Sequence, residues 1–116
     1  LFLAWFPKRT RRRIAEAGLK GFTKNTITDA GALEEQVQVI RERGYSLNNE
    51  ENMDGLIGIA VPVFGSDGKP IAGLSVHAPV FRLPLARVQE HYRRLQKTAD
   101  ELAAYYNEMS VRNGDE

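Results

Sequence analysis

The sequence contains no cysteine, which excludes disulfide bonds, thiolate nucleophiles and cysteine-bound zinc. It also has no apolar run approaching the roughly 20 residues that a membrane helix needs. The apolar stretch at its start, LFLAWF, has no charged segment before it and no small-residue cleavage site after it, so it is not a signal peptide. Because the chain begins inside this run and without methionine, we expect further sequence upstream.

Positive and negative charges nearly balance, because the sequence has 16 Lys and Arg residues and 15 Asp and Glu residues. A dedicated nucleic-acid binder would carry a larger, clustered positive excess. Catalytic motifs are also missing, since there is no Gly-x-Ser-x-Gly elbow, no Walker loop and no dinucleotide fingerprint. Glu50 and Glu51 are adjacent, so on a strand they would point to opposite faces and could not act as a pair. The sequence therefore does not predict an enzyme and calls for no cofactor.

Metal binding is poorly supported as well. The two histidines, His77 and His91, are too few for a zinc site, which usually has three or four protein ligands. For His77 three roles remain open: a structural residue, a contact to a ligand, or a metal ligand assisted by Glu50 and Glu51. For His91 we expect a position on a helix surface. We therefore predict no metal site.

The composition, with 116 residues of which 42% are hydrophobic and 27% charged, predicts one globular domain. A first helix is expected over residues 1–18, interrupted at Pro7, followed by a loop to residue 28. Asp29 is expected to cap a second helix, which ends at Gly44 in a left-handed conformation. Apolar residues at helical spacing lie between these two caps, namely Leu33, Val37 and Ile40.

The pattern changes to strands after this second helix. Residues 45–47 are expected to form a short strand, and residues 56–78 alternate with a period of two. Asp67-Gly68 predicts a hairpin with a type I′ turn, in which both central residues have positive φ. A long amphipathic helix is expected from Leu83 to about Met109, with a frayed tail over residues 110–116. The fold class is therefore α+β, with adjacent antiparallel strands covered by helices.

A hairpin centred on Asp67-Gly68 pairs residues whose numbers sum to 135, which sorts the side chains onto two faces. One face is aliphatic, and we expect it to lie under the helices; its pairs are Ile59 with Val76, Val61 with Leu74, and Val63 with Ala72. The other face is small and partly polar; its pairs are Gly58 with His77, Ala60 with Ser75, and Pro62 with Gly73.

The small face allows two interpretations. Small residues leave volume above a sheet, and Ser75 and His77 could orient a ligand there. Alternatively, this face is solvent-exposed, or it is covered by a loop with Ser75 hydrogen-bonded locally. The alternation by itself does not decide between a pocket and a plain surface.

A basic cluster in the first helix also has two interpretations. Its members are Lys8, Arg9, Arg11, Arg12 and Arg13. A phosphate-binding patch is one reading, and a solvated helix face is the other. No glycine-rich loop and no interleaved aromatic residues accompany the cluster, which favours the solvated face.

Several segments together resemble the effector-binding domain of IclR-type bacterial transcriptional regulators. Leu3-Ala4 and Asn25-Thr26-Ile27-Thr28 match early landmarks of that family. The resemblance covers nearly the whole chain. Its most specific part is a block made of RERGYS at 41–46, NNEEN at 48–52, GLIGIAVPVF at 55–64, and DG at 67–68 followed by IAGLSV at 71–76, Pro79 and Arg82.

The resemblance implies a GAF- or PAS-like fold, with a curved antiparallel sheet flanked by helices. It implies a cytoplasmic one-component regulator that binds a small carboxylated or aromatic metabolite and forms a homodimer or homotetramer. Operator DNA would be bound only through an N-terminal winged helix-turn-helix. Residues 1–116 are accordingly expected to be a partial effector-binding domain, without that winged domain and without the first strands. No membrane partner is implied.

The family's effector-binding positions fall on Asn48, Gly58, Ser75 and His77. Relatives that bind small 2-oxo acids usually have an acidic residue where Asn48 stands, a hydroxyl where His77 stands, and a bulkier residue at Gly58. A larger or differently charged effector is therefore expected, and its identity stays open. The sequence predicts a small-molecule sensor whose ligand shifts operator binding, and the alternative is a structural oligomerisation module that binds no metabolite.

Overall fold

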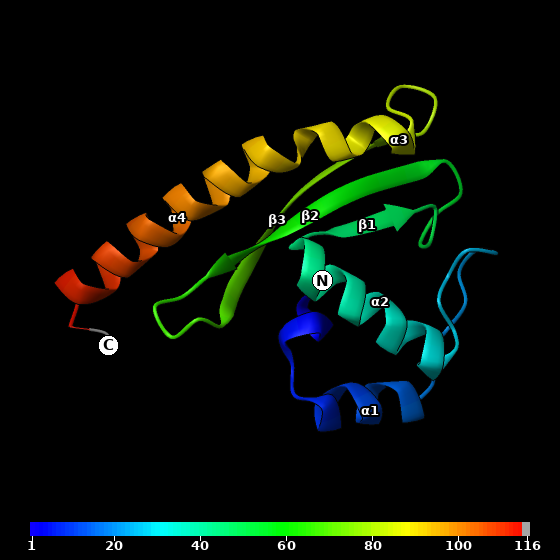
Figure 1. The fold of residues 1–116 in the computed structure, drawn as a ribbon, viewed down its shortest axis with the longest axis horizontal. Coiled ribbons are helices and arrows are strands. Elements are labelled where there is room, and N and C mark those ends of the chain that lie inside the picture. The colour runs from blue at the N-terminus through cyan, green and yellow to red at the C-terminus, as the bar shows by residue number, and fades with distance from the viewer. Residues whose placement is uncertain (115–116) are drawn as a thin grey trace.

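A computed structural model describes residues 1–114 and places a three-stranded antiparallel sheet between two layers of helices (Figure 1). The strand order is β1-β2-β3, so β2 is central. This arrangement confirms the predicted α+β class. The elements, in chain order, are η1 (Phe2–Trp5), α1 (Lys8–Glu16), α2 (Ala30–Arg43), β1 (Ser46–Asn49), β2 (Leu56–Phe64), β3 (Pro70–Pro79), α3 (Leu85–Val88), η2 (Gln89–His91) and α4 (Tyr92–Arg112).

The first two helices begin and end where their capping residues predict. Pro7 separates the 3-10 turn η1 from α1 and is the N-cap residue of α1. The Asp29 carboxylate accepts the Ala32 N–H at 2.8 Å and so caps α2. At the other end of α2, Gly44 has a φ of 88°, the left-handed conformation that favours glycine.

The C-terminal helix differs from the prediction in two ways. It is not continuous, because a short α3 and the 3-10 turn η2 precede α4. It also runs further than predicted, since residues 110–112 are helical and not frayed. An ion pair between Glu108 and Arg112 at 3.0 Å, four residues apart, supports this last turn. The part of the predicted tail at residues 115 and 116 lies outside the described residues.

The hairpin register agrees with the prediction at every pair from Gly58–His77 to Val63–Ala72. The type I′ turn is wrong, because of its two central residues only Gly68 has a positive φ, of 77°. The Gly68 N–H donates to the Gly65 carbonyl, and the Gly65 N–H donates to the Lys69 carbonyl. This is a type I turn followed by a left-handed glycine, the usual three-residue hairpin loop. The register shift stays confined to the end of β2, between Val63 and Phe64.

The aliphatic face of β2 forms the main core. Ile57, Ile59, Val61 and Val63 are at most 4% exposed and lie in one cluster with side chains of α3 and α4, including Val88, Leu95 and Ala99. The partner strand β3 is less covered than predicted. Leu74 is half-buried, whereas Ala72 and Val76 are exposed. α4 packs mainly against β2, and β3 is an edge strand of the described sheet (Figure 1).

A second, smaller core joins η1 to α2 on the opposite side of the sheet. Its buried members are Ala4, Val37 and Ile40. No described helix is both long enough and apolar enough to cross a membrane.

Candidate functional site

A cavity of about 530 Å³ lies over the small face of the sheet, on the side opposite α4. Its floor comes from all three strands, and its walls come from η1, α2 and the loop after β1. We call it the sheet cavity. Its lining residues are Leu1, Phe2, Leu3, Ala4, Ile27, Leu33, Gln36, Val37, Ile40, Ser46, Leu47, Asn48, Glu51, Asn52, Gly58, Ile59, Ala60, Gly73, Ser75 and His77.

The four residues predicted as effector-binding all line the sheet cavity. Gly58 and His77 are directly paired across β2 and β3, and Asn48 pairs with Gly58 from β1. Ser75 is one position further along, paired with Ala60. Because directly opposed residues in an antiparallel sheet point to the same face, these side chains share one surface. The arrangement confirms that Gly58, Ser75 and His77 lie on one face of the hairpin, and the structure shows that this face lines a hollow.

Gly58 is required to be small by its surroundings. A Cβ atom built on it would lie 2.5 Å from Cδ2 of His77 and 2.9 Å from the Val76 carbonyl oxygen. The imidazole of His77 therefore leans across β2 and lies against the Gly58 backbone. At the other end of the floor, a Cβ on Gly73 would meet the Leu1 side chain at 3.2 Å, because η1 covers that end.

Ser46, Glu51 and Gln36 also line the cavity and were not among the predicted site residues. Ser46 pairs with Ala60 and so lies in line with Ser75. The alternation within β1 puts Ser46 and Asn48 on one face, but the loop between β1 and β2 is irregular. The length of this loop therefore does not predict which face of the sheet Ser46 and Asn48 occupy, whereas the length of a tight turn would.

The loop after β1 is held in shape by its own carboxylates and amide. The Asn48 Oδ1 accepts the Glu51 N–H at 3.0 Å, and the Glu51 Oε2 accepts the Asn49 N–H at 2.9 Å. Glu50 has a φ of 53°, and its Oε1 accepts the Gly55 N–H at 2.7 Å. Glu50 and Glu51 are therefore loop residues and not strand residues, and both bind backbone N–H groups. The strand geometry that the sequence analysis used to separate them therefore does not apply.

Three polar side chains from the loop before α2 bind the same loop from outside. Thr23 and Thr26 donate their hydroxyls to the carbonyls of Glu50 and Glu51. Asn25 donates its side-chain amide to the Asn49 carbonyl at 2.9 Å. These contacts join segments about 25 residues apart in the sequence. They hold Asn48 and Glu51 at the rim of the sheet cavity.

The lining of the cavity carries little positive charge. It includes one carboxylate, Glu51, and no lysine or arginine. Among the described residues, no three His, Asp or Glu side chains are grouped as a metal site would require. The cavity is therefore suited to a ligand held by hydrogen bonds and apolar contact.

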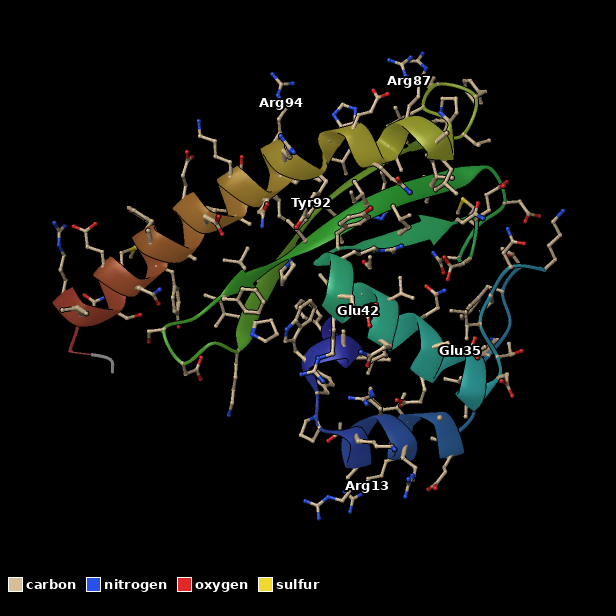
Figure 2. The ribbon with its side chains drawn as sticks, viewed as in Figure 1. Arg13, Glu35, Glu42, Arg87, Tyr92 and Arg94 are labelled. Atoms are coloured by element: carbon tan, nitrogen blue, oxygen red, sulfur yellow. The ribbon has the colours of Figure 1, made fainter. Side chains whose placement is uncertain are left out.

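The basic cluster of α1 divides into one buried residue and four exposed ones. Arg11 is only 7% exposed; its guanidinium donates two hydrogen bonds to Glu34, at 2.9 and 3.0 Å, and one to the Phe6 carbonyl at 2.7 Å. These bonds lower the pKa of the Glu34 carboxyl and fasten α1 to α2. The other members, Lys8, Arg9, Arg12 and Arg13, are exposed, and Figure 2 shows Arg13 on the side of α1 that points away from the sheet.

The family model for the C-terminal part of the bacterial transcriptional regulator IclR matches residues 1–104 of this chain. The regulator BhcR of Paracoccus denitrificans is 39% identical over 97 residues, which are 84% of this chain and 35% of BhcR. KdgR of Escherichia coli is 39% identical over 105 residues, or 90% of this chain and 40% of KdgR. The chain thus spans well under half the length of these curated relatives.

Solved structures give the same result. The crystal structure of the C-terminal domain of Escherichia coli KdgR matches with a TM-score of 0.81 and 38% identity, over 91% of this chain and 65% of that one. The inducer-binding domain of PobR from Acinetobacter, a double mutant in complex with 3-hydroxybenzoic acid, matches with a TM-score of 0.80 and 32% identity, over 87% of this chain and 59% of that one. These relatives are named as regulators and not as enzymes, in agreement with the prediction from the missing catalytic motifs. The chain therefore belongs to the IclR family of bacterial transcriptional regulators.

Proposed function

We propose that this chain is the effector-sensing part of a bacterial one-component transcriptional regulator, and that its effector binds in the sheet cavity. The observation that carries the proposal is the hollow itself. Small residues of β2 form its floor, polar residues of β1 and β3 surround them, and its volume of about 530 Å³ suits a metabolite. The double mutant of the PobR inducer-binding domain, solved in complex with 3-hydroxybenzoic acid, supports a ligand role for the matching region of this chain.

In this proposal Asn48, Ser75 and His77 hydrogen-bond the polar groups of the effector, and Gly58 makes room for the His77 imidazole beside it. The Ser75 hydroxyl makes no side-chain hydrogen bond to another described residue, and Ser75 and His77 are both exposed, so their polar groups are available to a ligand. Each serine hydroxyl offers one donor and two acceptor sites to a ligand.

Regulation then follows from a shift between two arrangements of the protein. The effector contacts the sheet, α2 and the loop that Thr23, Asn25 and Thr26 hold, so it favours the arrangement in which these parts are drawn together. A ligand shifts such an equilibrium only by the difference between its affinities for the two states. Operator binding through a winged helix-turn-helix outside residues 1–116, a cytoplasmic location and assembly as a homodimer or homotetramer are parts of the same proposal.

The test is to measure effector binding in paired variants of the full-length protein. A panel of carboxylated and aromatic metabolites is first screened by thermal shift, since a ligand at about 100 times its Kd stabilises by roughly 2.7 kcal/mol. Ser75→Ala and His77→Ala should then weaken the hit at least about tenfold while the protein stays folded. Ser66→Ala, in the exposed hairpin turn, and His91→Ala, in η2, are matched controls outside the cavity. Unchanged affinity in both cavity variants would remove the assignment.

A second candidate function is a structural oligomerisation module that binds no metabolite. It is favoured by exposed apolar side chains on the C-terminal half of α4, among them Leu102, Tyr105, Tyr106 and Met109. This alternative predicts that no compound of the panel shifts the unfolding temperature. It also predicts that Tyr105→Ser with Tyr106→Ser changes the oligomeric state in analytical ultracentrifugation, whereas Ser75→Ala has no effect in either assay.

A further inference from the structure

Two rows of side chains cross the floor of the sheet cavity, and both have the same order. One row is Ser46, Ala60 and Ser75; the other is Asn48, Gly58 and His77. Each row places a polar residue on β1, a small residue on β2 and a polar residue on β3. Since neighbouring strands lie about 4.8 Å apart, the backbones of β1 and β3 are about 10 Å apart. Ala60 leaves a low apolar floor between Ser46 and Ser75, whereas the His77 imidazole leans inward over Gly58.

The two polar lines differ in charge. On the β1 side, Glu51 adds a carboxylate next to Asn48, and its Oε1 remains available because the Asn49 N–H binds Oε2. On the β3 side are the Ser75 hydroxyl and the His77 imidazole, each of which can donate a hydrogen bond to an anion. The β1 side therefore accepts a hydrogen bond from a hydroxyl and repels an anion, whereas the β3 side can donate to an anion.

From this asymmetry we infer that the effector is a ring-sized hydroxy monocarboxylate that lies flat on Ala60, beside the His77 imidazole that covers Gly58. Its carboxylate faces Ser75 and His77, and its hydroxyl faces Ser46, Asn48 and Glu51. Ser46 and Glu51 are thereby assigned as specificity-determining residues. A dianion is rejected because its second carboxylate would lie beside Glu51, with no lysine or arginine in the lining to neutralise it. The inference rests on the proposed function, since it names the class of ligand for the same cavity.

Four related ring compounds test each part of the assignment. 4-Hydroxybenzoate has both groups, benzoate lacks the hydroxyl, phenol lacks the carboxylate, and terephthalate replaces the hydroxyl with a second anion. We expect 4-hydroxybenzoate to bind at least about tenfold more tightly than each of the other three in calorimetric titrations at neutral pH, because each lost hydrogen bond or added repulsion is worth roughly that factor.

Variants then assign the two ends. Glu51→Gln keeps an oxygen for the Asn49 N–H but removes the charge, so it should bring terephthalate to within about threefold of 4-hydroxybenzoate. Glu35→Gln removes the same charge from α2 outside the cavity and should leave the ranking unchanged (Figure 2). Ser46→Ala should reduce the preference for 4-hydroxybenzoate over benzoate, because it removes one partner of the hydroxyl.

The outcomes separate this inference from the function on which it rests. Terephthalate binding as tightly as 4-hydroxybenzoate, or a ranking that Glu51→Gln leaves unchanged, overturns the inferred ligand class. The ligand class is also overturned if none of the four compounds binds while another metabolite binds in a Ser75-dependent manner. In that case the proposed effector site remains supported. No binding by any compound of either panel overturns both proposals.

Discussion

The two faces of the β2–β3 hairpin are built from alternate residues of the same strands, and they differ in almost every physical property. Toward α4, β2 presents Ile57, Ile59, Val61 and Val63, all nearly inaccessible to water. Toward η1 and α2 the same strand presents Gly58 and Ala60, under a cavity of about 530 Å³. Stability is concentrated on one face, and space for a ligand is left on the other. Adjacent residues are therefore expected to respond very differently to substitution.

The largest effect on stability should come from the aliphatic face. Ile59 is 1% exposed in the main core, so Ile59→Ala removes buried methyl groups and leaves a void. We expect a loss of about 2–5 kcal/mol in the free energy of unfolding, measured by urea denaturation. A loss below about 1 kcal/mol would show that α4 does not pack on this face as described.

A smaller loss should follow from filling the floor of the cavity. In Gly58→Ala the new methyl group would meet the His77 ring and the Val76 carbonyl oxygen, so either the ring or the strand has to move. We expect about 1–3 kcal/mol of destabilisation, together with a loss of effector binding. For stability Gly73→Ala is the matched control, because the heavy atoms nearest to its Cβ would belong to the Leu1 and Phe2 side chains, at 3.2 Å or more. Equal effects of the two substitutions would contradict the close approach at Gly58.

The helical wall of the cavity should respond to acid. The hydrogen bonds from Arg11 hold the pKa of Glu34 below its ordinary value of 4.5. A carboxyl with a depressed folded pKa stabilises the protein above its unfolded pKa, and this contribution is lost as the pH falls through the folded value. The stability advantage of the wild type over Glu34→Gln should therefore shrink between about pH 5 and pH 3. Thermal unfolding across this range measures it, and a constant difference would mean that the ion pair contributes nothing.

The smallest effect on stability should come from the polar residue of the small face. Ser75 is exposed and makes no described side-chain hydrogen bond, so Ser75→Ala should change the free energy of unfolding by no more than about 0.5 kcal/mol. Its effect belongs to ligand affinity instead. If Ser75→Ala destabilised the protein as strongly as Ile59→Ala, the assignment of stability to one face and ligand binding to the other would be wrong.

Local patterns were sufficient to predict the hairpin and its two faces. The alternation along residues 56–78 and the turn at Asp67-Gly68 predict which residues pair, and a different turn type did not alter this pairing. The caps at Asp29 and Gly44 also follow from local chemistry. Gly58, Ser75 and His77 were found because they depend only on this hairpin, and the family resemblance added Asn48.

The remaining features depend on contacts between distant segments. Ser46 and Glu51 reach the cavity because the loop after β1 is shaped by Thr23, Asn25 and Thr26 from before α2, and no local pattern reports such contacts. The exposure of β3 has a similar cause, because periodicity shows which face of a strand is apolar but not how far a helix covers it. The prediction ended the last helix at about Met109 because chain ends commonly fray, whereas α4 continues through Arg112, where an exposed ion pair joins Glu108 and Arg112.

The most direct measurement is a crystal structure of the protein with the tightest-binding compound of the metabolite panel. The account predicts density for the compound over Ala60 and beside the His77 ring, within hydrogen-bonding distance of Ser75 on β3 and of at least one polar side chain on β1. Density on the α4 side of the sheet, or on the protein surface away from β1, β2 and β3, would contradict it.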